Sequence, residues 1–303
     1  MNPMSQCRAG LRACLAVLLT LLVLAAGCAG TAKKETTSAE SGFRTVLYQE
    51  GADQIPIYCY RPASWKQGGP VFLAFPGEHR DAEETCRALQ EQADRCGVLV
   101  ASPLFAEDRY PGSAYNLGRM TVRDNQAGRV EPAAKWTLPL AGKVRDAVLK
   151  AYASPDSTVT LFGHSAGSQY LHRYVLFDKG RAGDRYVLAN AGWYTMPDDG
   201  VRFPYGLQGL PPETQHLSAA FAKPVTVLLG ESDIKRSGSL RKTPEADAQG
   251  QTRLERGRRF YAALQEKARQ QGVPFAWHLA TVPGVGHDTA AMARAAMKLV
   301  YEK

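Results

Sequence analysis

Cysteine is scarce in this chain. The few cysteines present argue against a domain held together by several disulfides and against a zinc site. The 303 residues include six cysteines, of which three precede residue 30. The remaining Cys59, Cys86 and Cys96 allow one disulfide at most, so the domain is not a small disulfide framework. Their pairing does not follow from the sequence, although Cys86 and Cys96 on one straight helix would stand ~15 Å apart, too far to bond. No zinc-ligand spacing and no nearby histidine motif accompanies them, so we expect neither a metal site nor a cysteine nucleophile.

Charge of one sign does not dominate the chain either. The formal net charge is +8, which is modest for a chain of this length. No RNA-binding motif and no interleaving of aromatic with basic residues goes with it, so nucleic acid is not an expected partner. Basic residues cluster between Lys235 and Arg259. We interpret this cluster as a solvated loop and helix face, with contact to anionic lipid headgroups as the alternative.

The apolar run Ala13–Ala26 is too short to span a bilayer, which takes ~20 residues in a helix. It follows Arg8 and Arg12 and ends at Gly27, the arrangement of an export signal. The stretch Leu24-Ala-Ala-Gly-Cys28 resembles a bacterial lipobox, although Ala25 stands where leucine is commoner. The resemblance implies that Cys28 becomes the lipidated first residue of the mature protein. Ordinary signal cleavage near Ala29 is the alternative.

These features divide the chain into three parts. We predict a signal peptide over residues 1–27, the lipidated Cys28 with a flexible tether over residues 28–42, and one folded domain over residues 43–303. The tether is rich in Ser, Thr, Ala, Lys and Glu. Ala29 lacks the acidic character that marks inner-membrane retention in lipoproteins. The expected location is therefore the outer membrane, facing the periplasm, with the lipid anchor as the membrane contact.

Strand and helix patterns alternate along the folded part of the chain. Strands are predicted at 43–49, 55–61, 71–75, 97–101, 157–162, 186–190, 224–230 and 275–281. Helices are predicted at 82–95, 136–151, 166–178, 252–271 and 288–301. The fold class is therefore α/β, with an eight-stranded, mostly parallel sheet and helices on both faces. Two long irregular stretches, 102–135 and 191–222, follow strands and should emerge at the carboxyl edge, where ligands bind.

The most informative motif is Gly163-His-Ser-Ala-Gly167, which stands between a predicted strand and a predicted helix. This context is typical of a nucleophile elbow, in which a strained turn exposes the Ser165 hydroxyl at the carboxyl end of the sheet. Small neighbours are needed because the turn is tight. The alternative is a glycine-rich turn that merely contains a serine.

An activated serine needs a base and a group that orients the base. His287 follows the final strand in the glycine-rich loop Pro283–His287, directly before the last helix. Asp233 follows the strand at 224–230, at the carboxyl end, where it could accept the imidazole N–H. Glu231 is the rival carboxylate. Asp288 is expected to cap the last helix.

An oxyanion hole would complete the site. One donor should be the backbone N–H of Ala166, the residue after the nucleophile. The other should come from the loop after the third strand, Phe75–Arg80, where we favour the Glu78 N–H and keep His79 as the alternative.

Several motifs together resemble the α/β-hydrolases of the polyhydroxybutyrate-depolymerase and feruloyl-esterase-like group. They are Gly163–Gly167, Gly230-Glu-Ser-Asp233, Pro283–Asp288, and the segments 191–197 and 239–245. The resemblance implies an α/β-hydrolase fold and a cofactor-free serine hydrolase with Ser165 as nucleophile, His287 as base and Asp233 as acid. The chain departs from the family at Pro76-Gly77, where His-Gly is usual.

Aromatic residues could form the walls of a substrate cleft. Trp193 and Tyr194 follow the sixth strand, Tyr115 lies in the first irregular stretch, and Phe203 and Tyr205 lie in the second. We expect Trp193, Tyr194 and Tyr115 to contact an aryl or medium-length acyl ester, with plain packing as the alternative. A carboxylic ester hydrolase is the favoured function. A serine peptidase on the same fold and a catalytically silent binding lipoprotein are the alternatives.

Overall fold

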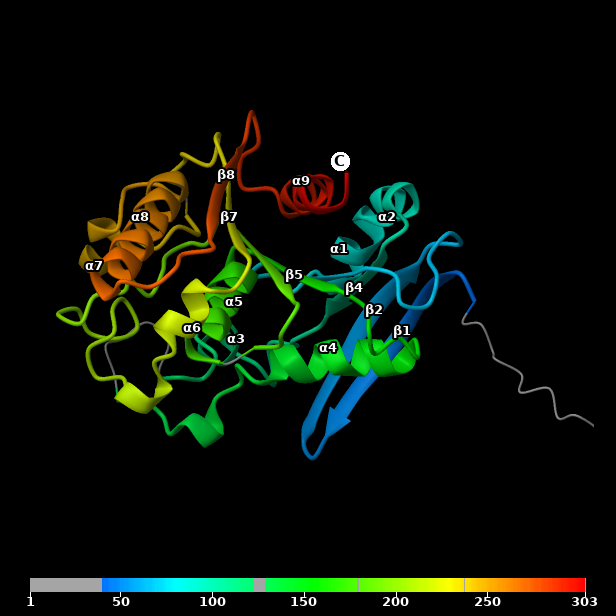
Figure 1. Ribbon diagram of the computed structural model, residues 1–303, viewed down its shortest axis with the longest axis horizontal. Coiled ribbons are helices and arrows are strands. Elements are labelled where there is room, and N and C mark those ends of the chain that lie inside the picture. Colours follow the sequence, from blue (N-terminus) through cyan, green and yellow to red (C-terminus); the bar gives the residue numbers. More distant parts are fainter. Residues whose placement is uncertain (1–39, 122–128, 179, 237, 303) are drawn as a thin grey trace, which may run out of the picture. The chain divides into compact units, whose positions relative to one another are not determined.

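The computed structural model describes residues 40–121, 129–178, 180–236 and 238–302, and these contain one sheet of eight strands (Figure 1). The strands are β1 (Gly42–Glu50), β2 (Asp53–Arg61), β3 (Val71–Phe75), β4 (Leu99–Pro103), β5 (Val159–His164), β6 (Arg185–Ala189), β7 (Val225–Gly230) and β8 (His278–Val282). Their spatial order is β1-β2-β4-β3-β5-β6-β7-β8. β2 pairs antiparallel with β1 and β4, and the other pairs are parallel. The predicted α/β fold class is confirmed.

Helices connect these strands. They are α1 (Ala82–Ala88), α2 (Gln90–Cys96), α3 (Gly112–Tyr115), α4 (Leu140–Ala151), α5 (Ala166–Phe177), α6 (Leu217–Phe221), α7 (Pro244–Ala248), α8 (Arg253–Gln271) and α9 (Thr289–Tyr301). Two 3₁₀ turns, Ala133–Lys135 and Pro212–Thr214, lie in the two long stretches that the sequence left irregular. Among the described residues, no helix is both long and apolar enough to cross a membrane.

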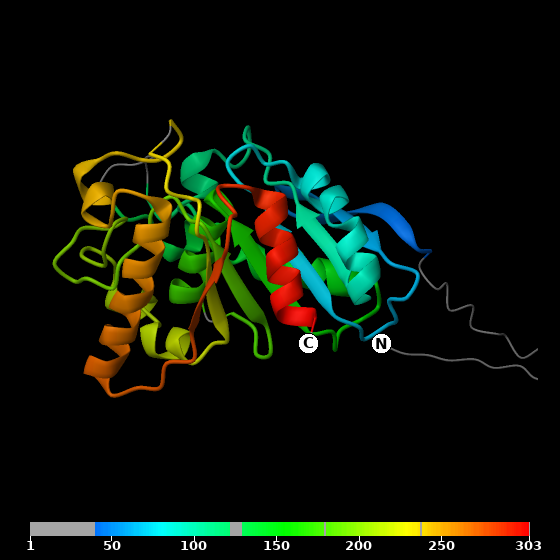
Figure 2. The same ribbon diagram turned by 90° about the horizontal axis from the view of Figure 1, so that it is seen from above.

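The two faces of the sheet pack against different side chains. On β3, Leu73 and Phe75 belong to one buried cluster with residues of α4, α5 and α8. Phe72 and Ala74 belong to a second cluster with residues of α1, α2 and α9. Consecutive side chains of a strand point to opposite faces, which produces this division. Helices therefore cover both faces, and α1, α2 and α9 run along one of them (Figures 1 and 2).

Two predicted helices have different bounds in the structure. The helix predicted at 82–95 is interrupted at Leu89, whose φ of −102° and ψ of 0° end α1 and precede α2. The apolar periodicity continues across Leu89, so the sequence pattern did not indicate a break there. The helix predicted from residue 136 begins only at Leu140, because Pro139 disfavours a helical conformation in the residue before it. Cys59, Cys86 and Cys96 are free thiols.

The described residues cover only part of the three predicted segments of the chain. Cys28 and most of the predicted tether lie outside the described residues, as does the whole predicted signal peptide. The domain boundaries therefore stay a prediction.

Candidate active site

Ser165 lies in a strained turn between β5 and α5. Its φ is 53° and its ψ is −113°, and its N–H donates to the Ala189 carbonyl at 3.0 Å. A Cβ on Gly163 would lie 2.5 Å from the Gly167 carbonyl oxygen, and a Cβ on Gly167 would collide with the Phe75 carbonyl. Both glycines are therefore required by close backbone approach, which is the geometry expected of a nucleophile elbow.

A chain of hydrogen bonds joins the three predicted triad residues. Nε2 of His287 lies 3.0 Å from Ser165 Oγ, and its Nδ1 lies 2.7 Å from Asp233 Oδ2. The Asp233 side chain is buried, whereas the His287 side chain is 26% exposed. Glu231 is exposed, and it accepts a hydrogen bond from the Thr281 hydroxyl instead. Of the two carboxylates considered, the structure brings Asp233 to the imidazole.

Backbone contacts and one side chain hold the turn at residues 230–233, which carries Asp233, against the loop at residues 283–287, which carries His287. The Ser232 N–H donates to the Val285 carbonyl at 2.9 Å. Asn190 accepts from the Gly230 N–H at 2.9 Å and donates to the Gly286 carbonyl at 3.2 Å. Sequence reasoning missed Asn190, which is fully buried and has a φ of 45°. Its position directly after β6 was the available signal, since asparagine tolerates left-handed backbone.

His164 supports the ring of His287. The two ring centroids are 4.5 Å apart, and Nδ1 of His164 lies 2.9 Å from Thr289 Oγ1. Burial, with a smaller effect of the neighbouring His287, lowers the pKa of His164 well below its usual value. His164 is therefore neutral near pH 7 and packs against His287 without adding charge.

The predicted oxyanion donors lie beside Ser165. Ala166 is the first residue of α5, where backbone N–H groups have no acceptor within the helix. Ala166, Glu78 and Ser165 line the same cavity. A turn closed by the Arg80 N–H and the Gly77 carbonyl at 3.2 Å carries Glu78, whose carbonyl accepts from the Arg80 guanidinium at 2.6 Å. This contact fixes the Glu78 peptide in the loop that shares the cavity with Ser165.

Solved structures with the same arrangement of elements establish the family. The chain is 33% identical to poly(aspartic acid) hydrolase-1 from Sphingomonas sp. KT-1, with a TM-score of 0.79 over 87% of this chain and 100% of that chain. It is 34% identical to a poly(3-hydroxybutyrate) depolymerase from Bordetella parapertussis, with a TM-score of 0.77 over 87% and 91% of the two chains. The chain belongs to the polyhydroxybutyrate-depolymerase-like α/β-hydrolases.

More distant structures share the fold alone. An S-formylglutathione hydrolase from Agrobacterium tumefaciens is 13% identical, with a TM-score of 0.53 over 84% of this chain and 92% of that chain. No protein-family model matches the chain. No curated protein sequence matches it either.

In this α/β-hydrolase the cavity beside Ser165 has a volume of about 230 Å³. Its walls are mainly polar, and they include Gln169, Arg241 and Arg253 together with Trp193. A larger hollow of about 790 Å³ lies between residues 196–201 and helices α7 and α8, and Ser165 is not among the described residues that line it. The smaller cavity is the one that a reacting group must use.

Two of the three predicted substrate contacts of this hydrolase are wrong. Trp193 lines the cavity, as expected. Tyr115 and Tyr194 are fully buried, so no substrate reaches their rings. Tyr115 donates to the Pro76 carbonyl at 2.8 Å and thereby supports the loop after β3, while Tyr194 stacks on Phe260 with centroids 4.2 Å apart. The packing alternative holds for both residues.

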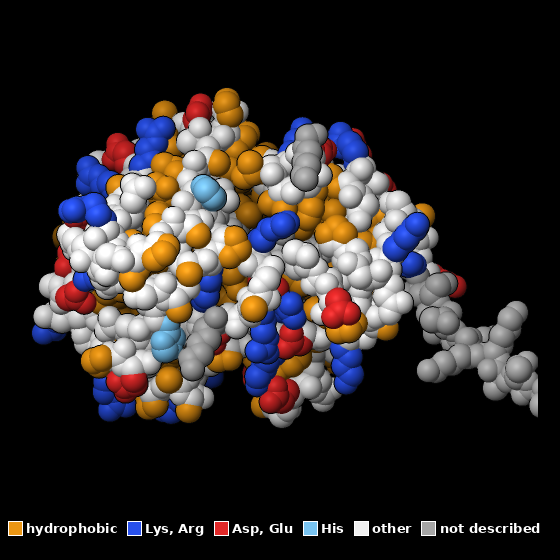
Figure 3. All heavy atoms as spheres, viewed as in Figure 1, with side chains coloured by type: hydrophobic (Ala, Val, Ile, Leu, Met, Phe, Trp, Pro, Cys, Tyr) orange, Lys and Arg blue, Asp and Glu red, His pale blue; other side chains and the backbone are white. Residues whose placement is uncertain are grey.

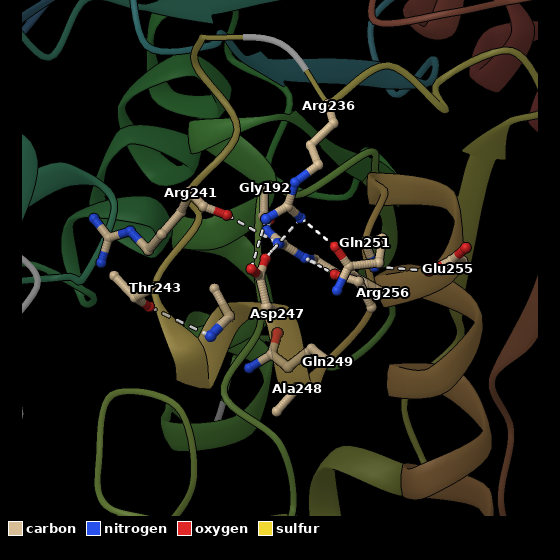
Figure 4. A network of polar contacts seen from close by, with 12 residues as sticks. Gly192, Arg236, Arg241, Thr243, Asp247, Ala248, Gln249, Gln251, Glu255 and Arg256 are labelled. Atoms are coloured by element: carbon tan, nitrogen blue, oxygen red, sulfur yellow. Dashed lines mark hydrogen bonds and ion pairs between the residues drawn. The ribbon is translucent and has the colours of Figure 1, made fainter.

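Part of the basic cluster predicted to be solvated is buried instead. Arg253 and Arg256 are 2% and 0% exposed. Arg256 donates to the carbonyls of Gly192 and Arg241 and pairs with Asp247, as Figure 4 shows. This network ties the start of α8 to two segments that line the cavity. On the face shown in Figure 3, basic and acidic side chains lie interspersed.

Proposed function

We propose that this hydrolase cleaves carboxylic esters through a covalent acyl-enzyme. The observation that supports the proposal best is the hydrogen-bonded series Ser165, His287 and Asp233 at the carboxyl end of the sheet. The mature protein would be held at the outer membrane by a lipid on Cys28, and its substrate would be a small or polymer-derived ester.

The chemistry follows from the geometry. Ser165 Oγ attacks the ester carbonyl while its proton passes to Nε2 of His287, and Asp233 holds the imidazole in the required tautomer. The N–H groups of Ala166 and Glu78 stabilise the oxyanion that forms. The C–O bond to the alcohol breaks as His287 returns the proton to the leaving oxygen. Water then attacks the acyl-enzyme carbonyl while its proton passes to His287, and the proton is returned to the Ser165 oxygen as the acid leaves.

A second candidate is cleavage of amides in an acidic polymer. Two observations favour it: arginines line the cavity, and one relative that is 33% identical is named a poly(aspartic acid) hydrolase. The same triad serves both reactions, because an amine leaves with the same proton that an alcohol takes. A serine peptidase also cleaves amides, so the peptidase alternative belongs to this second candidate.

A substrate panel separates the candidates. Purified full-length protein is assayed with p-nitrophenyl esters, feruloyl esters, the matching anilides and poly(aspartic acid), with Ser165→Ala as the background control. We expect turnover of esters that disappears in Ser165→Ala. Turnover of anilides or poly(aspartic acid) without ester turnover would favour the second candidate, and no turnover of any substrate would favour a binding lipoprotein.

A further inference from the structure

Two guanidinium groups lie over the indole of Trp193, which forms part of the cavity wall. The Cζ atom of Arg173 is 4.6 Å from the ring centroid, and that of Arg241 is 4.7 Å from it. Such cation–π contacts stabilise each arginine on the ring but leave its positive charge in place. Two like charges therefore lie close together at Trp193, and one of them belongs to Arg241, which lines the cavity.

Neither arginine has an acidic partner among the described residues. Arg173 is fully buried and donates to Thr195 Oγ1 and to the carbonyls of Asn116 and Gln169. Its Nη2 is buried and has no hydrogen-bond partner in the described part of the chain. Arg241 donates to the Tyr205 hydroxyl at 3.1 Å. Burying a charge without a counterion is costly, so a bound anion would relieve this arrangement.

The nearby carboxylates are already engaged. Asp247 pairs with Arg236 at 2.6 Å and with Arg256 at 3.0 Å. Figure 4 shows that Arg241 turns its carbonyl toward Arg256 while its side chain leads away from Asp247. Asp233 is held by His287 and Arg253. Glu78 is the only carboxylate among the described lining residues, and it is exposed.

Other donors face the same space. Arg253 lines the cavity, and its Nε is buried without a hydrogen-bond partner among the residues that the structure describes. Gln169 also lines it. At about 230 Å³ the cavity is smaller than the ~300–1,000 Å³ typical of pockets for drug-sized ligands. A short group that carries hydrogen-bond acceptors therefore fits it better than a long acyl chain does.

We propose that this cavity binds an ionised carboxyl group of the substrate, so that the preferred substrates are monoesters of short dicarboxylic acids. Arg241 is the specificity-determining residue, because it lines the cavity, its guanidinium lies over Trp193, and it has no carboxylate partner among the described residues. Arg173 supports the site through its contact with Trp193 and its hydrogen bonds to the carbonyls of Asn116 and Gln169. The inference rests on the proposed ester hydrolysis and names the substrate class of that same site.

Matched pairs of esters test the proposal. Release of ethanol from ethyl hydrogen succinate, glutarate and adipate is compared with release from the ethyl monoesters of equal chain length that lack the second carboxyl group. We expect the ratio of kcat/KM, charged over neutral, to exceed one for at least one chain length in the full-length protein. Arg241→Gln should lower that ratio about tenfold, as loss of one charge-assisted hydrogen bond does.

Two further variants sharpen the comparison. Lys242→Gln removes the same charge from an exposed neighbour that is not part of the described lining, so its ratio should stay that of the wild type. Arg241→Lys keeps the charge and should retain part of the preference. Turnover of both ester series with a ratio near one, or an equal fall in Arg241→Gln and Lys242→Gln, would overturn the carboxylate site while leaving ester hydrolysis standing.

A second measurement does not depend on turnover. Free glutarate should slow the labelling of Ser165 by a fluorophosphonate probe, compared with chloride at equal ionic strength, and Arg241→Gln should abolish the slowing. Equal labelling rates in glutarate and chloride would contradict the proposal. Absence of labelling under both conditions would instead contradict the proposed function.

Discussion

At the scale of single residues, Asp233 is held from two sides. His287 Nδ1 lies 2.7 Å from one carboxylate oxygen, and Arg253 Nη1 lies 3.5 Å from the other. The side chains of Asp233 and Arg253 are each only 2% exposed. Burial lowers the pKa of Arg253, and the carboxylate of Asp233 counteracts this effect. The ion pair therefore fixes the orientation of the carboxylate that faces the imidazole.

The role of Asp233 gives the first prediction. Asp233→Asn should lower kcat for ester hydrolysis by on the order of 10⁴-fold, because the amide no longer fixes the imidazole tautomer. Glu231→Gln is the matched control, since this exposed carboxylate contacts Thr281 and not His287. Steady-state kinetics of both variants checks this. A severe loss in Glu231→Gln with near-normal Asp233→Asn would show that the wrong carboxylate was chosen.

The meeting of Ser165, His287 and Asp233 could be predicted from the sequence, because each of these residues follows a recognisable strand. Tyr115 and Tyr194 could not be placed correctly, since their burial depends on packing between segments far apart in the chain. Tyr115 meets Pro76, and Tyr194 meets Phe260. Arg253 and Asn190 were missed for the same reason. A local pattern reports which strand end a residue occupies, not which distant side chain reaches it.

At the scale of elements, the turn between β5 and α5 depends on glycine. We expect Gly163→Ala to destabilise the fold by about 1–3 kcal/mol and to abolish activity, because its Cβ would lie 2.5 Å from the Gly167 carbonyl oxygen. Urea denaturation measures the loss. Gly238→Ala serves as the stability control, because a Cβ there has no atom within 4 Å. Equal stability of the two variants would contradict the packing argument.

The connection between α6 and β7 gives a pH-dependent prediction. Lys223 donates to the carbonyls of Val175 and Asp178, and burial lowers its pKa to about 8. Between that value and the ordinary lysine pKa of about 10.4, the unfolded chain binds a proton that the native state does not. The free energy of unfolding should therefore gain an increment as the pH rises through this window.

Substitution of Lys223 isolates this contribution. Lys223→Met should lose the increment, while Lys150→Met, at an exposed lysine, should keep it. Urea denaturation across the same pH window provides the comparison. If the pH dependence is identical in Lys223→Met and in the wild type, the pKa of Lys223 is the same in the folded and in the unfolded protein, and the prediction is wrong.

At the scale of the whole molecule, the alternation of strands and helices predicted the fold, because each parallel strand requires a crossover. The pattern did not reveal the short helices α3, α6 and α7. Of these, α3 contacts α5, and α6 contacts α5 and α8. Nor did the pattern reveal that the last strand begins at His278 and not at Phe275. Trp277 precedes this strand and packs into the core, where its indole N–H donates to the Ala220 carbonyl at 2.8 Å.

The proposed lipid anchor gives a prediction at this scale. The wild type expressed in a Gram-negative host should fractionate with membranes, and its mature N-terminus should carry the mass of an acylated Cys28. Cys28→Ser should be recovered unacylated and away from membranes, because several acyl chains together bind a bilayer stably. A soluble wild type with an unmodified N-terminus at Ala29 or beyond would indicate a plain secreted hydrolase.

The most direct test of the central claim is where a fluorophosphonate probe attaches. Peptide mass spectrometry of the labelled protein should locate a single adduct on Ser165, and Ser165→Ala should take up no probe while keeping its fold. Ser168→Ala is the matched control, because the hydroxyl of this buried serine has no hydrogen-bond partner within the described ranges and should be dispensable. Labelling that persists in Ser165→Ala, or an adduct on another residue, would contradict the assignment of Ser165 as the nucleophile.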